Sequence, residues 1–107
     1  MIRVCQLKRE IGEFPEGLHT VIGERGITIS GGQRARISLA RACYSQADIF
    51  LLDDPLSAVD PEVGDKIFRE CLRDYLRDKA ILLVTHQVKF LNQVDEVIVL
   101  EGGEQRY

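Results

Sequence analysis

The sequence predicts an α/β fold in which helices flank a parallel sheet, and three observations support this. Hydrophobic periodicity changes several times between helical spacing and short apolar runs. The runs at residues 49–52, 80–84 and 97–100 are continuously apolar, which is typical of strands buried on both faces of a parallel sheet. Helical patterns separate these runs, as in alternating α/β folds. Because the chain has 107 residues, of which 45% are hydrophobic, we expect at most one domain.

Composition excludes several classes of protein. The formal net charge is −3, from 14 basic and 17 acidic residues, so there is no basic footprint for nucleic acid or an anionic membrane surface. No apolar run approaches the roughly 18–20 residues of a spanning helix, and residues 1–10 lack the pattern of a secretory signal. We therefore expect the chain to stay in the cytosol. Its three cysteines are far apart in sequence, which predicts reduced, buried thiols rather than disulfides or a zinc site.

The first half of the chain is predicted to contain two helices joined by a loop. Residues 1–9 have apolar positions at helical spacing, although no capping residue precedes them, and residues 14–17 form a turn signal. Residues 19–29 are expected to be a loop with a few extended positions. A second helix should begin at the two glycines and continue to about residue 45, with one apolar side that comprises Ile37, Ala40 and Tyr44.

The second half is predicted to alternate between strands and helices. The strand at residues 49–52 ends in Asp53, Asp54 and Pro55, and a helix follows in which Asp60 is the N-cap and Pro61 the first residue. Its buried stripe comprises Val63, Ile67, Cys71, Leu72, Tyr75 and Leu76. Three opposite-charge pairs are expected on its solvated face, namely Asp65 with Arg69, Glu70 with Arg73 and Asp74 with Arg77. Two further strands, at 80–84 and 97–100, are separated by a short helix at 88–92.

Polar side chains follow two of the predicted strands. Asp53 and Asp54 come after one strand, and His86 comes after another. In open α/β sheets the ligand crevice lies beyond the carboxyl ends of the strands. A structural role explains the two aspartates alone equally well, since Asp is common in turns, and a lone histidine at a strand end is more often structural than a ligand. Together they indicate a cation or phosphate site, in which a carboxylate holds Mg²⁺ and a second one orients an attacking water.

A glycine-rich helix start adds an anion site. Gly31 and Gly32 open a predicted helix, where exposed backbone N–H groups and the helix dipole favour negative charge. Ser30 places a hydroxyl beside these groups, and Gln33 follows them. The glycines alone would also fit a flexible helix start.

These residues resemble the ATP-binding-cassette (ABC) ATPases. Residues 29–42, which begin Ile-Ser-Gly-Gly-Gln, are similar to the signature motif and signature helix of that family. Residues 49–53 resemble the Walker B strand, residues 57–60 the D-loop, and His86 the switch histidine. The run from Asp53 to Asp60 resembles more narrowly the first nucleotide-binding domain of subfamily C exporters, the multidrug-resistance-associated type, and the segments 2–7 and 20–26 also fit that type.

The resemblance implies a P-loop NTPase-type fold, present here in part. Residues 1–107 would be the C-terminal half of an ABC nucleotide-binding domain. Within it, residues 1–45 would end the helical subdomain and carry the signature motif, and residues 46–107 would carry the Walker B strand, the D-loop and the switch histidine. The implied cofactors are ATP and Mg²⁺.

The resemblance also implies roles for single residues. In the family, two such domains enclose ATP head to tail, so that Ser30, Gly31, Gly32 and Gln33 would act on the γ-phosphate of ATP held by the other domain. Asp53 would hold Mg²⁺, and Asp54 would face the attacking water. Asp60 would communicate across the dimer, and His86 would sense the γ-phosphate.

Two departures from the family pattern qualify the enzymatic role. No G-x-x-x-x-G-K-[ST] is present, so the Walker A loop is missing, as is the glutamine loop. The chain is therefore expected to be a fragment that binds ATP weakly or not at all by itself. Asp54 stands where hydrolytic members carry Glu. A carboxylate retracted by about 1 Å can cost on the order of a hundredfold in rate, so we expect a site that hydrolyses poorly.

The resulting functional hypothesis is that the chain is a piece of an ABC exporter. The intact parent would hydrolyse ATP to move organic anions or conjugates outward, with a second nucleotide-binding domain and transmembrane domains as partners and no nucleic acid. The domain would lie at the cytosolic face of a membrane. One alternative is the C-terminal head lobe of a chromosome-maintenance or DNA-repair ABC ATPase, although no heptad segment precedes the signature. Another is a short non-catalytic module that donates a signature loop to a partner ATPase.

Overall fold

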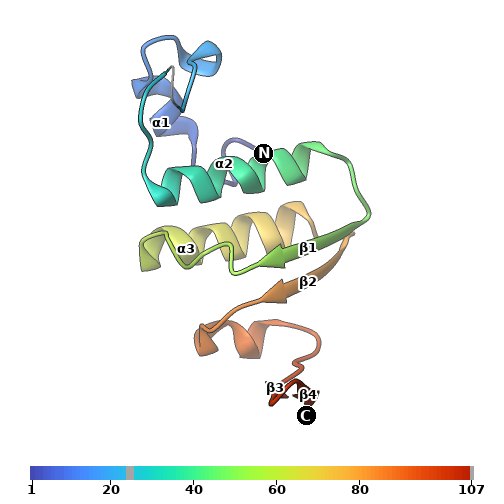
Figure 1. Ribbon diagram of the computed structural model, residues 1–107. Helices are drawn as coiled ribbons and strands as arrows, with labels where there is room; N and C mark the ends of the chain where they lie inside the picture. The colour runs from blue at the N-terminus through green and yellow to red at the C-terminus, as the bar shows by residue number, and fades with distance from the viewer. Residues whose placement is uncertain (24–25, 107) are drawn as a thin grey trace.

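The computed structural model describes residues 1–23 and 26–106, and its ribbon shows helices stacked beside a short sheet (Figure 1). The helical elements are α1 (Lys8–Glu13), η1 (Gly17–His19), α2 (Gly31–Tyr44), α3 (Pro61–Ile67), η2 (Phe68–Tyr75) and η3 (Val88–Gln93). The strands are β1 (Ile49–Asp53), β2 (Ala80–Val84), β3 (Leu100–Glu101) and β4 (Glu104–Gln105). Elements η1 and η3 are 3₁₀-helices, and η2 is a π-helix that continues α3. No helix in the described ranges has the length and apolar character needed to cross a bilayer.

Helix α2 and the continuous α3–η2 helix run side by side, as Figure 1 shows. The start of α2 lies against the segment that precedes α3, since Gly32 approaches Ala58. Further along both helices, Cys43 of α2 and Cys71 of η2 have their Sγ atoms 3.6 Å apart. Contacts at both ends show that the two helices are roughly parallel, which brings the glycine-rich start of α2 to the same end of the molecule as residues 57–60.

The core lies where the N-terminal turn, α2, α3–η2 and one face of the sheet meet. Its buried residues come from the N-terminal turn, α2, β1 with the loop after it, the α3–η2 helix with the residue after it, and η3: Val4, Cys5, Leu7, Leu39, Ala40, Cys43, Phe50, Leu56, Ile67, Phe68, Cys71, Leu72, Leu76 and Phe90. The rings of Phe68 and Phe90 stack with their centroids 4.2 Å apart. This stacking attaches η3, which follows the second strand, to the π-helix.

The parallel pairing that the sequence predicts is confirmed for two strands. β1 and β2 pair in parallel from Ile49 opposite Ala80 to Asp53 opposite Val84. The third predicted strand, at 97–100, is wrong. Only its last residue is in a strand, because β3 pairs with β4 in an antiparallel hairpin around Gly102 and Gly103. These glycines have φ values of +59° and +81°, the left-handed region in which a hairpin turn favours glycine.

The prediction that the strands are buried on both faces is also wrong. Along β1 and β2, side chains alternate between the core and solvent, so that Phe50 is buried whereas Leu51 is 74% exposed and Leu82 is 55% exposed. The helices in the described part of the chain cover the face that carries Phe50. The opposite face of this short sheet therefore presents apolar side chains to solvent.

The first helix starts later than the sequence predicts. Residues 2–6 form turns closed by hydrogen bonds such as Leu7 N–H to the Ile2 carbonyl at 3.0 Å, and α1 begins at Lys8. The predicted turn at residues 14–17 is present, with Gly17 at φ +55°. Helix α2 begins and ends where expected, but Tyr44 is 73% exposed and does not belong to its buried side. The short helix expected near residues 88–92 is present as η3.

The α3–η2 helix begins at Pro61, as predicted, but its cap and its charge pairs differ. The side chain of Asp60 makes no capping hydrogen bond, and Tyr75, placed in the buried stripe, is 47% exposed. Only the pair of Asp74 with Arg77 is found, at 3.5 Å. Asp65 pairs with Lys89 of η3 at 2.8 Å, and Glu70 accepts a hydrogen bond from Gln6 at 2.7 Å. These acidic groups bond to neighbouring segments because tertiary packing places better partners beside them.

Candidate functional site

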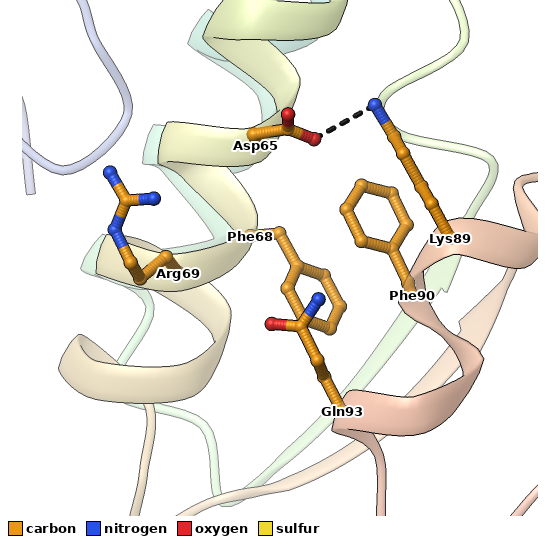
Figure 2. A pocket seen from close by; sticks show the side chains of 6 residues that line it. All are labelled: Asp65, Phe68, Arg69, Lys89, Phe90 and Gln93. Atoms are coloured by element: carbon orange, nitrogen blue, oxygen red, sulfur yellow. Dashed lines mark ion pairs between the residues drawn. The ribbon is translucent and has the colours of Figure 1, made fainter.

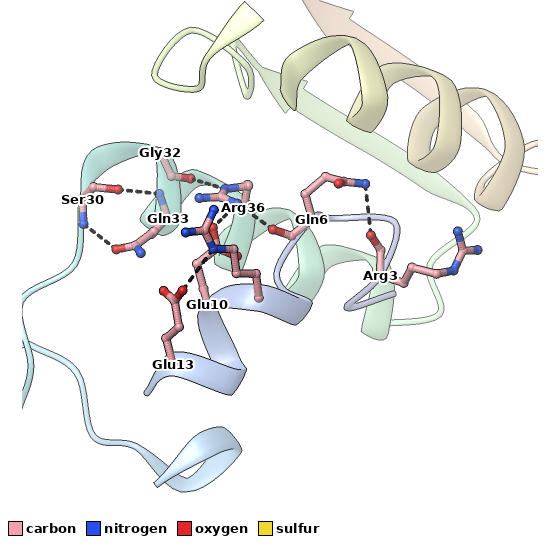
Figure 3. A network of polar contacts seen from close by, with 9 residues as sticks. Arg3, Gln6, Glu10, Glu13, Ser30, Gly32, Gln33 and Arg36 are labelled. Carbon is pink, nitrogen blue, oxygen red and sulfur yellow. Dashed lines mark hydrogen bonds and ion pairs between the residues drawn. The ribbon is translucent and has the colours of Figure 1, made fainter. Parts of the chain in front are cut away.

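The start of α2 is held by a reciprocal pair of hydrogen bonds (Figure 3). The backbone N–H of Gln33 donates to Ser30 Oγ at 3.0 Å, and the backbone N–H of Ser30 donates to Gln33 Oε1 at 2.9 Å. This arrangement is a capping box, which satisfies two of the donors that a helix start leaves unpaired. Among the described residues, no acceptor bonds to the N–H groups of Gly31 and Gly32. The sequence Ser-Gly-Gly-Gln therefore builds a rigid helix start with free backbone donors, the geometry that binds anions.

Gly32 brings this helix start against the segment of residues 57–60. A Cβ atom at position 32 would lie 2.9 Å from the carbonyl oxygen of Ala58, whereas one at Gly31 would lie 3.7 Å from Ala58 Cβ. Real Cβ atoms essentially never approach backbone as closely as the first distance. The second glycine of the motif thus has a packing reason, and the structure places the predicted signature segment beside the predicted D-loop.

The acidic pair lies at the carboxyl edge of the parallel strands. Asp53 ends β1 opposite Val84, and its side chain is exposed. Asp54 follows with φ +50°, and its N–H donates to the Val84 carbonyl at 2.8 Å. Asp is among the residues that tolerate this left-handed conformation. The bond extends the pairing of the two strands by one residue, and the bend turns the chain out of the sheet toward residues 55–60.

His86 follows β2 at the same edge, because parallel strands end on the same side. Its neighbours are held by local bonds, since the N–H of Gln87 donates to Thr85 Oγ1 at 3.1 Å and Gln87 Nε2 donates to the Leu56 carbonyl at 3.5 Å. The imidazole is exposed. The edge therefore presents His86 and the two carboxylates, as the strand order predicts, but their ligand atoms do not form one compact group: no set of three within 4.8 Å of one another includes them among the described residues.

Asp60 is exposed at the start of α3, and its carbonyl accepts the Gly64 N–H at 2.8 Å. It thus lies one residue after Val59 in the segment that Gly32 touches. The eight predicted site residues fall into two places, the start of α2 with residues 57–60 and the carboxyl edge of β1 and β2. The six residues from Asp54 to Val59 connect them.

Sequence reasoning missed a polar network behind the start of α2. Arg36 donates to the carbonyl of Gln6 at 2.6 Å, to Glu10 Oε1 at 2.7 Å and to the carbonyl of Gly32 at 3.2 Å (Figure 3). The Arg36 and Glu10 side chains are only 12% and 15% exposed. One guanidinium thus fixes the N-terminal turn, α1 and the first turn of α2 relative to one another. The sequence does not distinguish Arg36 from the other basic residues of this helix, so it could not predict this role.

Two surface hollows lie away from the predicted site residues. One of about 260 Å³ is lined by Asp65, Phe68, Arg69, Lys89, Phe90 and Gln93, where Lys89 bonds to Asp65 and its ammonium lies 5.2 Å from the centroid of the Phe90 ring (Figure 2). The other, of about 680 Å³, lies beside Arg3, Gln6 and Lys66. Neither contains a residue of the signature segment or of the strand edge.

The three cysteines give the other unexpected arrangement. Although Cys5, Cys43 and Cys71 are far apart in sequence, their sulfur atoms all lie within 4.8 Å of one another. The thiols are free and buried, as predicted. Their wide spacing along the chain predicts no metal site, whereas the fold brings the three sulfur atoms together.

Comparison with known proteins agrees with the motifs. The sequence model of the family described as ABC transporter matches residues 6–57. ABC transporter C family member 12 of Dictyostelium discoideum is 50% identical over 104 residues, which are 97% of this chain and 8% of that protein. ATP-binding cassette sub-family C member 4 of Mus musculus is also 50% identical over 104 residues, which are 97% of this chain and 8% of that protein. ABC transporter C family member 5 of Arabidopsis thaliana is 50% identical over 103 residues, 96% of this chain and 7% of that protein.

The chain thus spans less than a tenth of the length of these relatives. An ABC domain has a P-loop NTPase fold, and the short parallel sheet with helices is consistent with part of one. Half of the aligned residues are identical over nearly the entire sequence, and the resemblance extends through both places where the predicted site residues lie. The chain therefore belongs to the ABC transporter family, where it is similar to members of the C subfamily and corresponds to part of an ABC domain.

Proposed function

We propose that this chain works as part of an ATP-binding domain in an exporter, in which ATP binding and hydrolysis drive the transport of organic anions or conjugates across a membrane. The observation that carries the proposal is the capped helix start of α2, with free N–H groups at Gly31 and Gly32, packed against residues 57–60. Such a start favours a phosphate group. The relatives are named as transporters, which favours an exporter over a chromosome-maintenance head lobe.

The capping box leaves hydrogen-bond donors available for a nucleotide. Ser30 Oγ accepts the Gln33 N–H, so its own hydroxyl proton can be donated outward. Gln33 uses Oε1 to accept the Ser30 N–H, so its Nε2 amide group remains a donor. With the N–H groups of Gly31 and Gly32, these donors would bind the γ-phosphate of ATP held by a second ATP-binding domain.

The carboxyl edge of the strands suits the other half of the chemistry. Asp53 has an exposed carboxylate that bonds to no group in the described part of the chain, so it is free to hold a hydrated Mg²⁺. Bound Mg²⁺ would neutralise charge on the transferred phosphate. Asp54 would face the attacking water, and His86 would sense the γ-phosphate. Asp60, one residue beyond the contact with Gly32, would transmit the state of one site to the other.

The implied partners are a second ATP-binding domain and transmembrane domains, with the chain at the cytosolic face of the membrane and no nucleic acid bound. Ordering of loops by a γ-phosphate, and their release after hydrolysis, is a known means of driving a larger conformational change. Here the packing of Gly32 on Ala58 would couple the signature segment to residues 57–60.

The proposal is tested in membrane vesicles from cells that express the protein containing this chain. ATP-dependent uptake of carboxyfluorescein, an organic anion, is measured for wild type, Ser30→Asn and Ser30→Asp. Both replacements are good N-caps, so α2 should remain intact. The aspartate places a negative charge where the γ-phosphate would bind, so uptake should be lost, whereas the asparagine should retain much of it.

A blot with an antibody against residues 60–77 identifies the native product in the same cells. A large band in the membrane fraction is expected. Uptake that is equal in all three proteins would contradict the proposed role of Ser30. A soluble band near 12.1 kDa, the mass of the chain, would instead indicate a separate module that lends its signature segment to another ATPase.

A further inference from the structure

Three cysteines from three separate segments meet in the core. Cys5 lies in the turn that precedes α1, Cys43 in the last turn of α2, and Cys71 in the π-helix η2. Their sulfur atoms all lie within 4.8 Å of one another, and those of Cys43 and Cys71 are 3.6 Å apart. They are the only cysteines in the sequence. Three thiols can each be buried without lying next to one another, so the fact that these three are adjacent needs an explanation.

The distances fit coordination of one ion by three sulfur atoms. For a metal–sulfur bond of about 2.3 Å, three sulfur atoms arranged trigonally around an ion lie about 4 Å apart. The Cys43 and Cys71 sulfur atoms are 3.6 Å apart and no separation in the cluster exceeds 4.8 Å, so small side-chain movements would reach that arrangement. None of the three takes part in a disulfide.

Burial and ligand number restrict which ion is suitable. Cys5 and Cys71 are fully buried, and Cys43 is 7% exposed. Zinc in a structural site almost always has four ligands, and the described residues add no His, Asp or Glu to the group. Calcium and magnesium require oxygen ligands. Soft thiolate ligands select Cu(I) among the common ions, and three ligands in a dry core suit an ion that needs no fourth.

We propose that Cys5, Cys43 and Cys71 form a binding site for a soft, thiol-seeking cation with three sulfur ligands, and that Cu(I) is the ion that fits it. Each thiol that binds as a thiolate releases one proton to water, and the copper remains Cu(I), so the step needs no oxidant or reductant. Cys43 and Cys71 already share a hydrogen bond between their sulfur atoms at 3.6 Å, in which either thiol can be the donor.

Binding would add metal–sulfur bonds between three parts of the chain that are otherwise joined by packing and a few hydrogen bonds. The ion would link the N-terminal turn to both long helices, close to the point where Arg36 holds the same turn through Gln6. The π-helical form of η2 adds support, because such segments occur frequently at functional sites. This site is independent of the nucleotide chemistry proposed above, since none of its residues belongs to the signature segment or to the strand edge.

The test uses the full 107-residue chain under anaerobic, reducing conditions, with Cu(I) supplied from a chromophoric copper chelator that competes for it. One Cu(I) per folded chain is expected, and X-ray absorption should show three sulfur neighbours. Replacement of each cysteine singly, as Cys5→Ser, Cys43→Ser or Cys71→Ser, should lower the affinity at least about tenfold. Circular dichroism checks that each variant remains folded.

A relocation variant separates a built site from three available thiols. Cys5→Ser combined with Arg3→Cys keeps three cysteines but moves one to an exposed position two residues away. Its affinity should fall as far as that of Cys5→Ser alone. Cu(I) should also raise the thermal unfolding midpoint of the wild type and not that of the relocation variant, because a ligand stabilises only the state that it prefers.

Three results would overturn the proposal. They are equal affinity of the wild type and the relocation variant, equal affinity of the folded and the urea-unfolded wild type, and a two-sulfur environment in X-ray absorption. The last measurement needs only the wild type, so the proposal can be refuted even if every cysteine variant fails to fold. Tighter binding of Zn²⁺ with a fourth ligand would overturn the assignment to a three-coordinate ion.

Discussion

Gly32 lies so close to Ala58 that a Cβ atom at position 32 would be 2.9 Å from the Ala58 carbonyl oxygen. The contact joins the first turn of α2 to the segment between β1 and α3. It gives a glycine in a phosphate-binding type of motif a second role, because the same residue that leaves a backbone N–H free also allows two backbones to approach. Any side chain at position 32 would have to separate them.

Gly32→Ala should therefore destabilise the chain, by about 1–3 kcal/mol, because the added methyl group meets backbone that cannot rotate away. Gly12→Ala is the matched control. Gly12 is also helical, but a Cβ there would meet no atom within 4 Å, so alanine should raise stability by up to about 1 kcal/mol. Urea unfolding followed by circular dichroism measures both. Equal midpoints for the two variants would show that the close approach has no energetic weight.

Arg36→Ala should cost about 3 kcal/mol of stability, because it leaves the nearly buried Glu10 carboxylate without its cation. The second carboxylate oxygen of Glu10 is already buried without a hydrogen-bond partner, so no other group in the described part of the chain compensates. Arg34→Ala, at an exposed position of the same helix, should change stability by less than about 0.5 kcal/mol. A double-mutant cycle with Glu10→Gln measures the coupling, and an additive result would contradict the interpretation.

Gln46→Gly should stabilise the chain by about 0.5–1 kcal/mol. Gln46 has φ +59° immediately after Ser45, the C-cap of α2, which is the left-handed position that glycine occupies most readily. Its side chain is exposed, so little packing is lost. Ser45→Gly is the control, because Ser45 has φ −65° and gains nothing from glycine. Thermal unfolding midpoints should move in opposite directions, and a fall for Gln46→Gly would show that its conformation is not strained.

Asp54→Glu should increase ATP hydrolysis by the protein that contains this chain, because the longer side chain returns the carboxylate by about 1 Å toward an attacking water. Asp54→Asn keeps a residue type that tolerates φ +50° and removes the negative charge, so it should hydrolyse ATP more slowly than the wild type. Steady-state phosphate release measures all three. If the asparagine variant is as active as the wild type, Asp54 has no role toward water.

Local patterns in the sequence were sufficient for much of the fold. The start of α2 follows from serine, two glycines and glutamine, because a capping box forms within four residues. The parallel pairing of β1 with β2 follows from two apolar runs separated by a helix. The third predicted strand is wrong because two glycines turn the chain at once and a local hairpin is formed instead. The roles of the predicted site residues stay predictions.

Motifs whose residues are neighbours in the chain were enough to identify the family. Local patterns also predicted where α2 and α3 start, since capping and turn chemistry act over a few residues. Which distant groups meet depends on the tertiary structure. Arg36 and Glu10 are 26 residues apart, and Cys43 and Cys71 are 28 apart. No local propensity encodes such contacts, because they depend on how whole helices pack against one another. The physical reason is that burial selects a packing arrangement for the entire core, and the polar and sulfur groups that it carries inward must then find partners in that arrangement.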